Sequence, residues 1–166
     1  MNLFSAKWMV IVLMVLFSIS FSSGTLSAQA KLTIKPDKTV LSQQLLKEPI
    51  KFFGSGWGAG ETVVIELLIP KGIEMRGLGK EEDRVGIAVG TCNEKGDFET
   101  TMGTLATLNW FFQVAWIFDD KTTSMKSSFE KANPLPPGEY EILATGAITD
   151  KECRVYFEIL PHTKGQ

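Results

Sequence analysis

The sequence is poor in the residue types that most enzymes and metal sites need. It has one histidine, His162, and two cysteines, Cys92 and Cys153, among its 166 residues. This is too few, at the wrong spacings, for a zinc site, and His162 has no serine or aspartate partner near it. The glycine-rich stretch 54–60 leads into an expected strand, so it lacks the helix N-terminus that binds phosphate. We therefore expect no catalytic residues, no metal, no cofactor and a non-enzymatic role.

An excess of charge of one sign is also missing. The chain carries 17 basic and 19 acidic residues, for a formal net charge of −2. Proteins that bind nucleic acids usually carry a basic stripe or patch. We therefore expect no nucleic-acid partner.

The longest apolar run lies near the beginning of the chain. Lys7 precedes an apolar run from Trp8 to Phe21, and Ala28-Gln29-Ala30 follows a stretch of small residues. The run is shorter than the roughly 20 residues that span a bilayer, and this order is typical of a secretory signal peptide. We expect residues 1–30 to be cleaved off and the protein to be exported, either periplasmic or secreted. An uncleaved membrane anchor is the alternative.

The two cysteines allow one intramolecular disulfide, between Cys92 and Cys153. Export makes such a bridge chemically permissible. Two buried free thiols are the alternative, because the sequence does not fix the distance between the two residues.

Short β-strands separated by turn residues are the pattern of the remaining chain. Runs of β-branched and aromatic residues alternate with Gly, Pro, Asn and Asp, which is typical of an all-β domain. We expect strands at 31–35, 49–53, 61–69, 85–92, 97–102, 139–145 and 152–160. These strands belong to one domain over 31–161, with a tail at 162–166. On their solvent-exposed faces we expect Glu61, Glu66, Glu139 and Glu141.

Three turn motifs in a fixed order carry a resemblance to a known family. They are GSGWGAGETV at 54–63, NEKGDF at 93–98 and LPPGEYEILATG at 135–146. Their characteristic residues are Gly54, Gly56, Trp57, Gly60, Gly96, Pro137, Gly138 and Tyr140. From Ile50 to Leu160 the chain resembles bacterial extracytoplasmic immunoglobulin-like modules of the IPT/TIG type.

The resemblance implies an immunoglobulin-like Greek-key sandwich of about seven strands, used for adhesion, ligand display or spacing. It implies no shared chemistry, because one fold serves many functions. Tyr140 follows the turn Pro136-Pro137-Gly138. We expect its ring to lie inside and its hydroxyl to bond the backbone, as at a tyrosine corner.

Two insertions distinguish this chain from the family, near 71–84 and 103–134. The first is polar and predicts an exposed loop. The second contains the apolar run 105–118, whose alternation favours a strand or a hairpin, with a nearly all-apolar helix as the alternative. A short amphipathic helix is expected within 122–132. The whole aromatic-rich insertion precedes the last two strands of the sandwich.

Four aromatic residues of the second insertion, Trp110, Phe112, Trp116 and Phe118, allow two interpretations. They extend the core, or they form a docking patch for another envelope protein or a surface ligand, with peripheral membrane contact as a further possibility. The sequence therefore predicts an exported immunoglobulin-like binding module. The alternative is a structural subunit or spacer of a cell-envelope assembly, docked through this insertion.

Overall fold

The structure is a computed structural model that describes residues 29–162. The expected signal peptide lies almost entirely outside this range, as do the last four residues of the tail. Of the described residues, 45% lie in strands and 9% in helices, so this part of the protein is mostly β, as the sequence predicts.

Each of the seven expected strands forms, with ends that differ from the prediction by at most two residues. They are β1 (Lys31–Lys35), β3 (Lys51–Ser55), β4 (Thr62–Leu68), β5 (Arg84–Thr91), β6 (Phe98–Thr101), β9 (Gly138–Gly146) and β10 (Glu152–Leu160). The sequence did not predict β2 (Lys38–Val40) or β8 (Ser124–Ser128), whereas β7 (Ala115–Asp119) falls at the end of the run 105–118, for which a strand was favoured. Short helical turns are η1 (Gln43–Leu46), α2 (Thr104–Ala106) and η2 (Thr107–Phe111).

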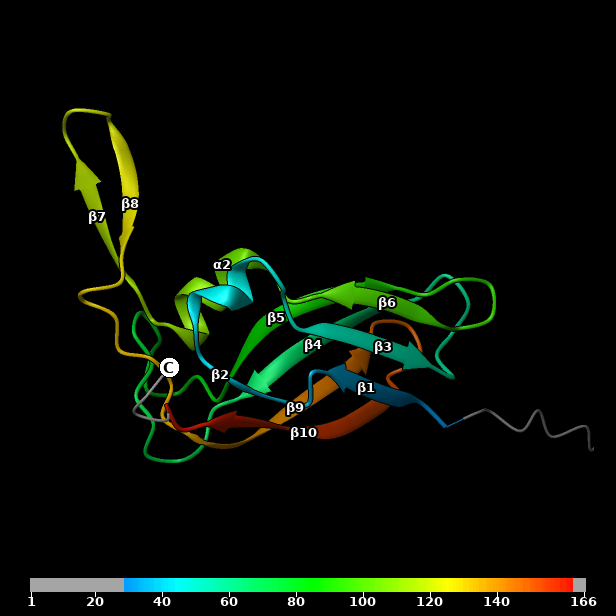
Figure 1. Cartoon of the computed structure of the whole chain (residues 1–166). Helices are drawn as coiled ribbons and strands as arrows, with labels where there is room; N and C mark the ends of the chain where they lie inside the picture. The colour runs from blue at the N-terminus through cyan, green and yellow to red at the C-terminus, as the bar shows by residue number, and fades with distance from the viewer. Residues whose placement is uncertain (1–28, 163–166) are drawn as a thin grey trace, which may run out of the picture.

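The strands form three sheets (Figure 1). One has the order β1-β3-β6, and the second has the order β2-β10-β9-β4-β5 and curls into a half-barrel. The third sheet contains only β7 and β8. A single hydrophobic cluster takes side chains from the first two sheets, including Phe52 of β3, Ile65 of β4 and Phe157 of β10. One core therefore holds the body of the molecule together, and the β7–β8 hairpin stands outside it.

The first two turn motifs pack against each other. The backbone amide of Trp57 donates to the carbonyl of Gly96 at 3.1 Å, and the Trp57 ring lies 6.3 Å from that of Phe98. Gly96 has a φ of 78°, and a Cβ there would collide with the Trp57 backbone. Glycine is required at this position both by its conformation and by this close approach.

Tyr140 forms the expected tyrosine corner. Its ring is buried, and its hydroxyl donates to the carbonyl oxygen of Pro136 at 2.7 Å. Burial raises the pKa of this hydroxyl, so it stays protonated as a donor. The prediction from the 135–146 motif is confirmed.

Cys92 and Cys153 are free thiols. Cys153 lies in β10, and Cys92 directly follows β5, which is separated from β10 by β9 and β4. Adjacent strands lie about 4.8 Å apart, so three strand spacings place the two backbones roughly 14 Å apart. A disulfide needs Cα atoms within about 7 Å, so the bridge that the sequence left open does not form in this fold. The free-thiol alternative holds, with Cys92 buried and Cys153 partly exposed.

Candidate functional site

The second insertion contains two unlike parts. Residues 104–111 are helical, as α2 and η2, and the chain then continues into the β7–β8 hairpin, which projects from the body (Figure 1). The strand favoured over 105–118 is therefore wrong for residues 105–111, where the helical alternative holds, and right only for residues 115–118, which belong to β7. The helix expected within 122–132 is also wrong, because Ser124–Ser128 pairs with β7 along its whole length. Pairing between strands outweighed the weak helical pattern of this segment.

The four aromatic residues of this insertion divide between core and surface. Phe112 is only 4% exposed and meets Phe129 edge-on at 5.5 Å. Trp110 is partly buried and packs against the core. Trp116 and Phe118 lie on the hairpin and are 39% and 54% exposed. The core interpretation therefore holds for Trp110 and Phe112, and the docking-patch interpretation applies only to Trp116 and Phe118.

A third apolar side chain, which the sequence did not indicate, joins this pair. Trp116 lies opposite Ser127 in the hairpin, and Phe118 lies opposite Met125. Directly opposed residues share a face of a two-stranded sheet, so Trp116, Phe118 and Met125 lie on the same side. Met125 is 54% exposed. We call these three residues the aromatic face of the hairpin.

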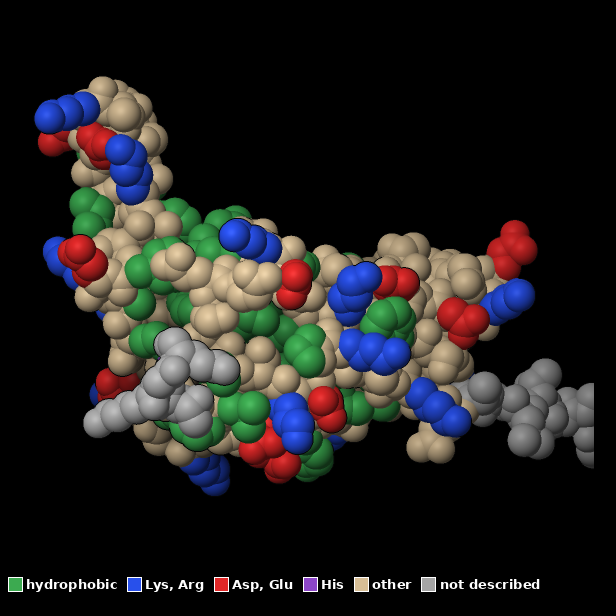
Figure 2. Space-filling view, viewed as in Figure 1, with side chains coloured by type: hydrophobic (Ala, Val, Ile, Leu, Met, Phe, Trp, Pro, Cys, Tyr) green, Lys and Arg blue, Asp and Glu red, His purple; other side chains and the backbone are tan. Residues whose placement is uncertain are grey.

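The hairpin is held at its base by a polar contact and carries charge at its outer end. The indole N–H of Trp116 donates to Oδ1 of Asn109, in η2, at 2.8 Å. At the outer end, Lys126 is hydrogen-bonded to Asp119, which also accepts the backbone amide of Lys121 at 2.9 Å. These two bonds, the one from Lys126 first, lower the pKa of Asp119. Figure 2 shows acidic and basic side chains side by side on this outer end.

The two insertions, which are far apart in the sequence, are joined at Gln113. This residue has a left-handed φ of 46° and a buried side chain. Its Oε1 accepts the backbone amide of Arg76 at 2.7 Å, and the Arg76 guanidinium donates to the carbonyl of Lys131 at 2.9 Å. The first insertion therefore supports the base of the hairpin. Sequence reasoning missed Gln113, because no local pattern indicates a partner 37 positions away.

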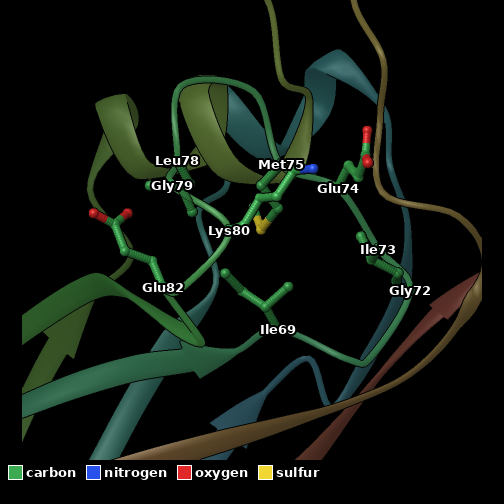
Figure 3. Close-up of a pocket in the computed structure, with 9 residues that line it drawn as sticks. All are labelled: Ile69, Gly72, Ile73, Glu74, Met75, Leu78, Gly79, Lys80 and Glu82. Atoms are coloured by element: carbon green, nitrogen blue, oxygen red, sulfur yellow. The ribbon is translucent and has the colours of Figure 1, made fainter.

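The first insertion also surrounds a cavity of about 420 Å³. In Figure 3, Ile69 and Met75 point toward this space, while Glu74 and Glu82 point away from it. A small-molecule site normally combines an apolar lining with a few polar groups aimed at the ligand. The charged residues of this cavity do not converge in that way, so the hairpin is the stronger candidate for binding.

At the opposite end of the sandwich, Glu61 is a fully buried carboxylate. One oxygen accepts the amide of Gly58 at 2.7 Å, and the other accepts the amides of Ile148 and Thr149 at 2.9 and 2.6 Å. The Thr149 hydroxyl adds a further bond at 2.9 Å. The prediction that Glu61 lies on an exposed face is wrong. Its side chain instead fastens the first turn motif to the β9–β10 turn.

The electrostatics of Glu61 identify it as structural. Burial raises the pKa of its carboxyl, but the bonds from Thr149, Gly58 and Ile148 outweigh that effect and lower the pKa to about 2. A general acid or base works best when it titrates near the working pH. Glu61 remains charged throughout that range and has all its lone pairs committed to the fold.

In the described residues the possible metal ligands are dispersed and the Cys92 thiol is buried. Within residues 29–162, no three His, Cys, Asp or Glu side chains are grouped so as to hold a metal ion. Burial, followed by the charges of Glu61 and Asp97, raises the pKa of the Cys92 thiol. Nucleophilic cysteines have lowered pKa values instead. No helix in the same range is long and apolar enough to cross a bilayer.

Comparison with known proteins adds no assignment to this geometry. No family model matches the chain, and no curated protein and no solved structure is significantly similar to it. The function is therefore inferred from the surface of the molecule, above all from the aromatic face.

Proposed function

We propose that this protein is an exported, non-catalytic, immunoglobulin-like binding module that docks onto an envelope protein or a surface ligand. The observation that carries the proposal is the aromatic face, where Trp116, Phe118 and Met125 are exposed together on a projecting hairpin. Exposed groups of large apolar side chains mark interaction sites, and aromatic residues are frequent anchors of binding energy.

The strand order supports the immunoglobulin-like part of the proposal. Leaving out β2 and the hairpin, β1, β3 and β6 have the positions of strands A, B and E in one sheet, and β10, β9 and β4 those of G, F and C in the other. β5 lies beside β4, where variable-type domains place strand C′. The tyrosine corner at the beginning of β9 is a further feature of strand F in this fold. These features favour an IPT/TIG-like Greek-key sandwich.

Export is proposed from residues 1–30, which have the order of a basic residue, an apolar run and Ala28-Gln29-Ala30. An exported protein with a bare apolar face meets partners in the envelope or outside the cell. The absence of a basic stripe in the sequence argues against a nucleic acid as the ligand.

A second candidate function is a structural subunit or spacer of a cell-envelope assembly. The firm support of the hairpin base favours it, because Asn109 holds the Trp116 ring and Gln113 ties the base to the first insertion. A pre-ordered arm loses little entropy when it docks permanently. Co-purification with one partner in a fixed ratio would distinguish this candidate from a reversible binding module.

The test is cell fractionation with a high-salt wash, comparing the native protein with a Trp116→Ser, Phe118→Ser double variant. A matched control replaces two exposed apolar residues of the body, Val89→Ser and Tyr156→Ser. We expect the native and control proteins to stay with the envelope fraction, and the hairpin variant to be released while it remains folded. Equal retention of all three proteins, or a freely soluble native protein, would contradict the proposal.

A further inference from the structure

The hairpin has a free strand edge that carries little charge. In the described residues, β7 pairs only with β8, so its other edge presents unpaired backbone groups. From Ala115 to Phe118 this strand contains no charge and no proline. Natural proteins protect an exposed edge with charged residues or prolines, because an unprotected edge is a template for strand addition. A two-stranded sheet standing alone is also only marginally stable in water.

From this geometry we infer that β7 pairs with β7 of a second copy of this chain, in an antiparallel arrangement about a two-fold axis at Ile117. In this register Trp116 stands opposite Phe118 of the second copy, and the reverse pair forms on the other side of the axis. Opposed aromatic residues stabilise antiparallel pairs, and their Cβ atoms lie about 5 Å apart. Asp119 falls opposite Ala115 of the second copy, so no like charges meet.

The other edge of the hairpin is unsuited to the same pairing. The central residue of β8 is Lys126, which is the register partner of Ile117. A two-fold axis there would place Lys126 opposite its own copy, and directly opposed like charges are destabilising. The two strands therefore differ: β7 is open to a second copy and β8 is protected.

The charges at the outer end of the hairpin also disfavour a bilayer as the partner. Asp119, Asp120 and Lys121 lie at or beside the turn of the hairpin, the end that would enter a membrane first. Figure 2 shows acidic and basic side chains together on this outer end. Placing such groups in hydrocarbon is costly. Pairing with a strand of another protein molecule involves only the middle of β7, so the charged groups stay in water.

The placement of the hairpin leaves space for a second copy. In Figure 1, β8 lies on the side of the body and β7 on the far side of the projecting arm. Two antiparallel arms would form a four-stranded sheet in which the two aromatic faces are continuous. Pairing through one short strand buries less than the roughly 1,200 Å² of a standard interface, so the dimer is expected to be weak and concentration-dependent. The inference rests on the proposed function, because it names a second copy of this chain as a partner of the same hairpin.

The first experiment is sedimentation velocity over a concentration series on the protein purified from cells. Ile117→Glu brings two carboxylates together at the two-fold axis, while within the hairpin the new side chain faces Lys126 favourably. The control is Val89→Glu, at an exposed apolar residue of the body. We expect native protein and control to dimerise, and Ile117→Glu to weaken the dimer at least tenfold with an unchanged circular dichroism spectrum.

The second experiment tests the register by cysteine cross-linking. Ile117→Cys and Lys126→Cys are compared under mild oxidation in a background carrying Cys153→Ala, since Cys92 is buried. The residue at the two-fold axis meets its own copy, so we expect a disulfide-linked dimer from Ile117→Cys and none from Lys126→Cys. Equal cross-linking at both positions would overturn the inference.

A native protein that stays monomeric at several hundred micromolar would also overturn the inference. The proposed function would survive that result if the Trp116→Ser, Phe118→Ser variant still lost its envelope retention, because the partner would then be another protein. Sedimentation of the monomer with vesicles of anionic lipid would instead identify a membrane surface and overturn the inference in favour of that partner. The failure of the inference and the failure of the proposed function are thus distinguishable.

Discussion

The two ends of this molecule use polar groups in opposite ways. At one end, Glu61 is 0% exposed and accepts three backbone amides, which join two turns. At the other end, the Asp119–Lys126 pair is open to solvent, and the apolar side chains around it are exposed. A buried carboxylate with all its bonds made specifies one arrangement of the chain, whereas an exposed pair contributes little to stability. The first end fixes the fold, and the second is free to serve binding.

The largest effect is expected from Glu61→Ala. Removing the carboxylate leaves the amides of Gly58, Ile148 and Thr149 buried without an acceptor, and each such loss costs about 1–3 kcal/mol. We expect the free energy of unfolding to fall by about 4 kcal/mol in urea denaturation. Glu99→Ala, which removes an exposed ion pair with Lys51, is the control and should change stability only slightly. Similar effects for both variants would remove the contrast between a buried carboxylate and an exposed ion pair.

Acid should weaken the same end of the molecule. The pKa of Glu61 is about 2 in the folded protein, below its ordinary value of 4.5. A group with a lowered folded pKa stabilises the protein above its unfolded pKa, and this contribution is lost as the pH falls through 4.5 toward 2. We expect a loss on the order of 2–3 kcal/mol over this window, measured by denaturation at several pH values. The loss should be much smaller in Glu61→Gln. If that variant lost as much stability in acid as the native protein does, Glu61 would not be the group responsible.

A smaller effect is expected at the tyrosine corner. Tyr140→Phe removes the hydroxyl that donates to the Pro136 carbonyl, but it keeps the buried ring. We expect the free energy of unfolding to fall by about 1 kcal/mol, the usual net contribution of one hydrogen bond. Tyr156→Phe, at an exposed tyrosine of β10, should leave the unfolding curve unchanged.

The smallest effect on stability is expected from the hairpin itself. Trp116→Ser with Phe118→Ser should change the free energy of global unfolding by no more than about 0.5 kcal/mol, because both side chains lie outside the core. The lost hydrogen bond from Trp116 to Asn109 holds only the projecting hairpin. The same variant should lose its partner in the fractionation experiment. A large drop in melting temperature would show that the aromatic face is part of the folding core.

Most of the body could be predicted, because its signals are local. Alternation of apolar and polar residues located β9 and β10, and the Pro-Pro-Gly turn indicated the position of Tyr140. The hairpin could not be predicted to the same extent. Ser124–Ser128 has little strand propensity and becomes β8 only because β7 lies beside it.

Residues with distant partners were the ones that sequence reasoning placed wrongly or missed. Glu61 was expected on the solvent-exposed face of its strand. Its burial depends on Ile148 and Thr149, which are 87 and 88 positions away. Gln113 gave no signal at all, since its partner Arg76 lies in the other insertion.

The sequence by itself determined the β class of this protein, the positions of its main strands and the turns between them. These depend on side-chain periodicity and on backbone preferences of Gly and Pro, which act over a few residues. Only the tertiary structure decided which carboxylate is buried, which thiols stay apart and which aromatic residues remain in solvent. Those outcomes depend on which distant strands come together, because burial and hydrogen bonding are properties of contacts between segments rather than of the segments themselves.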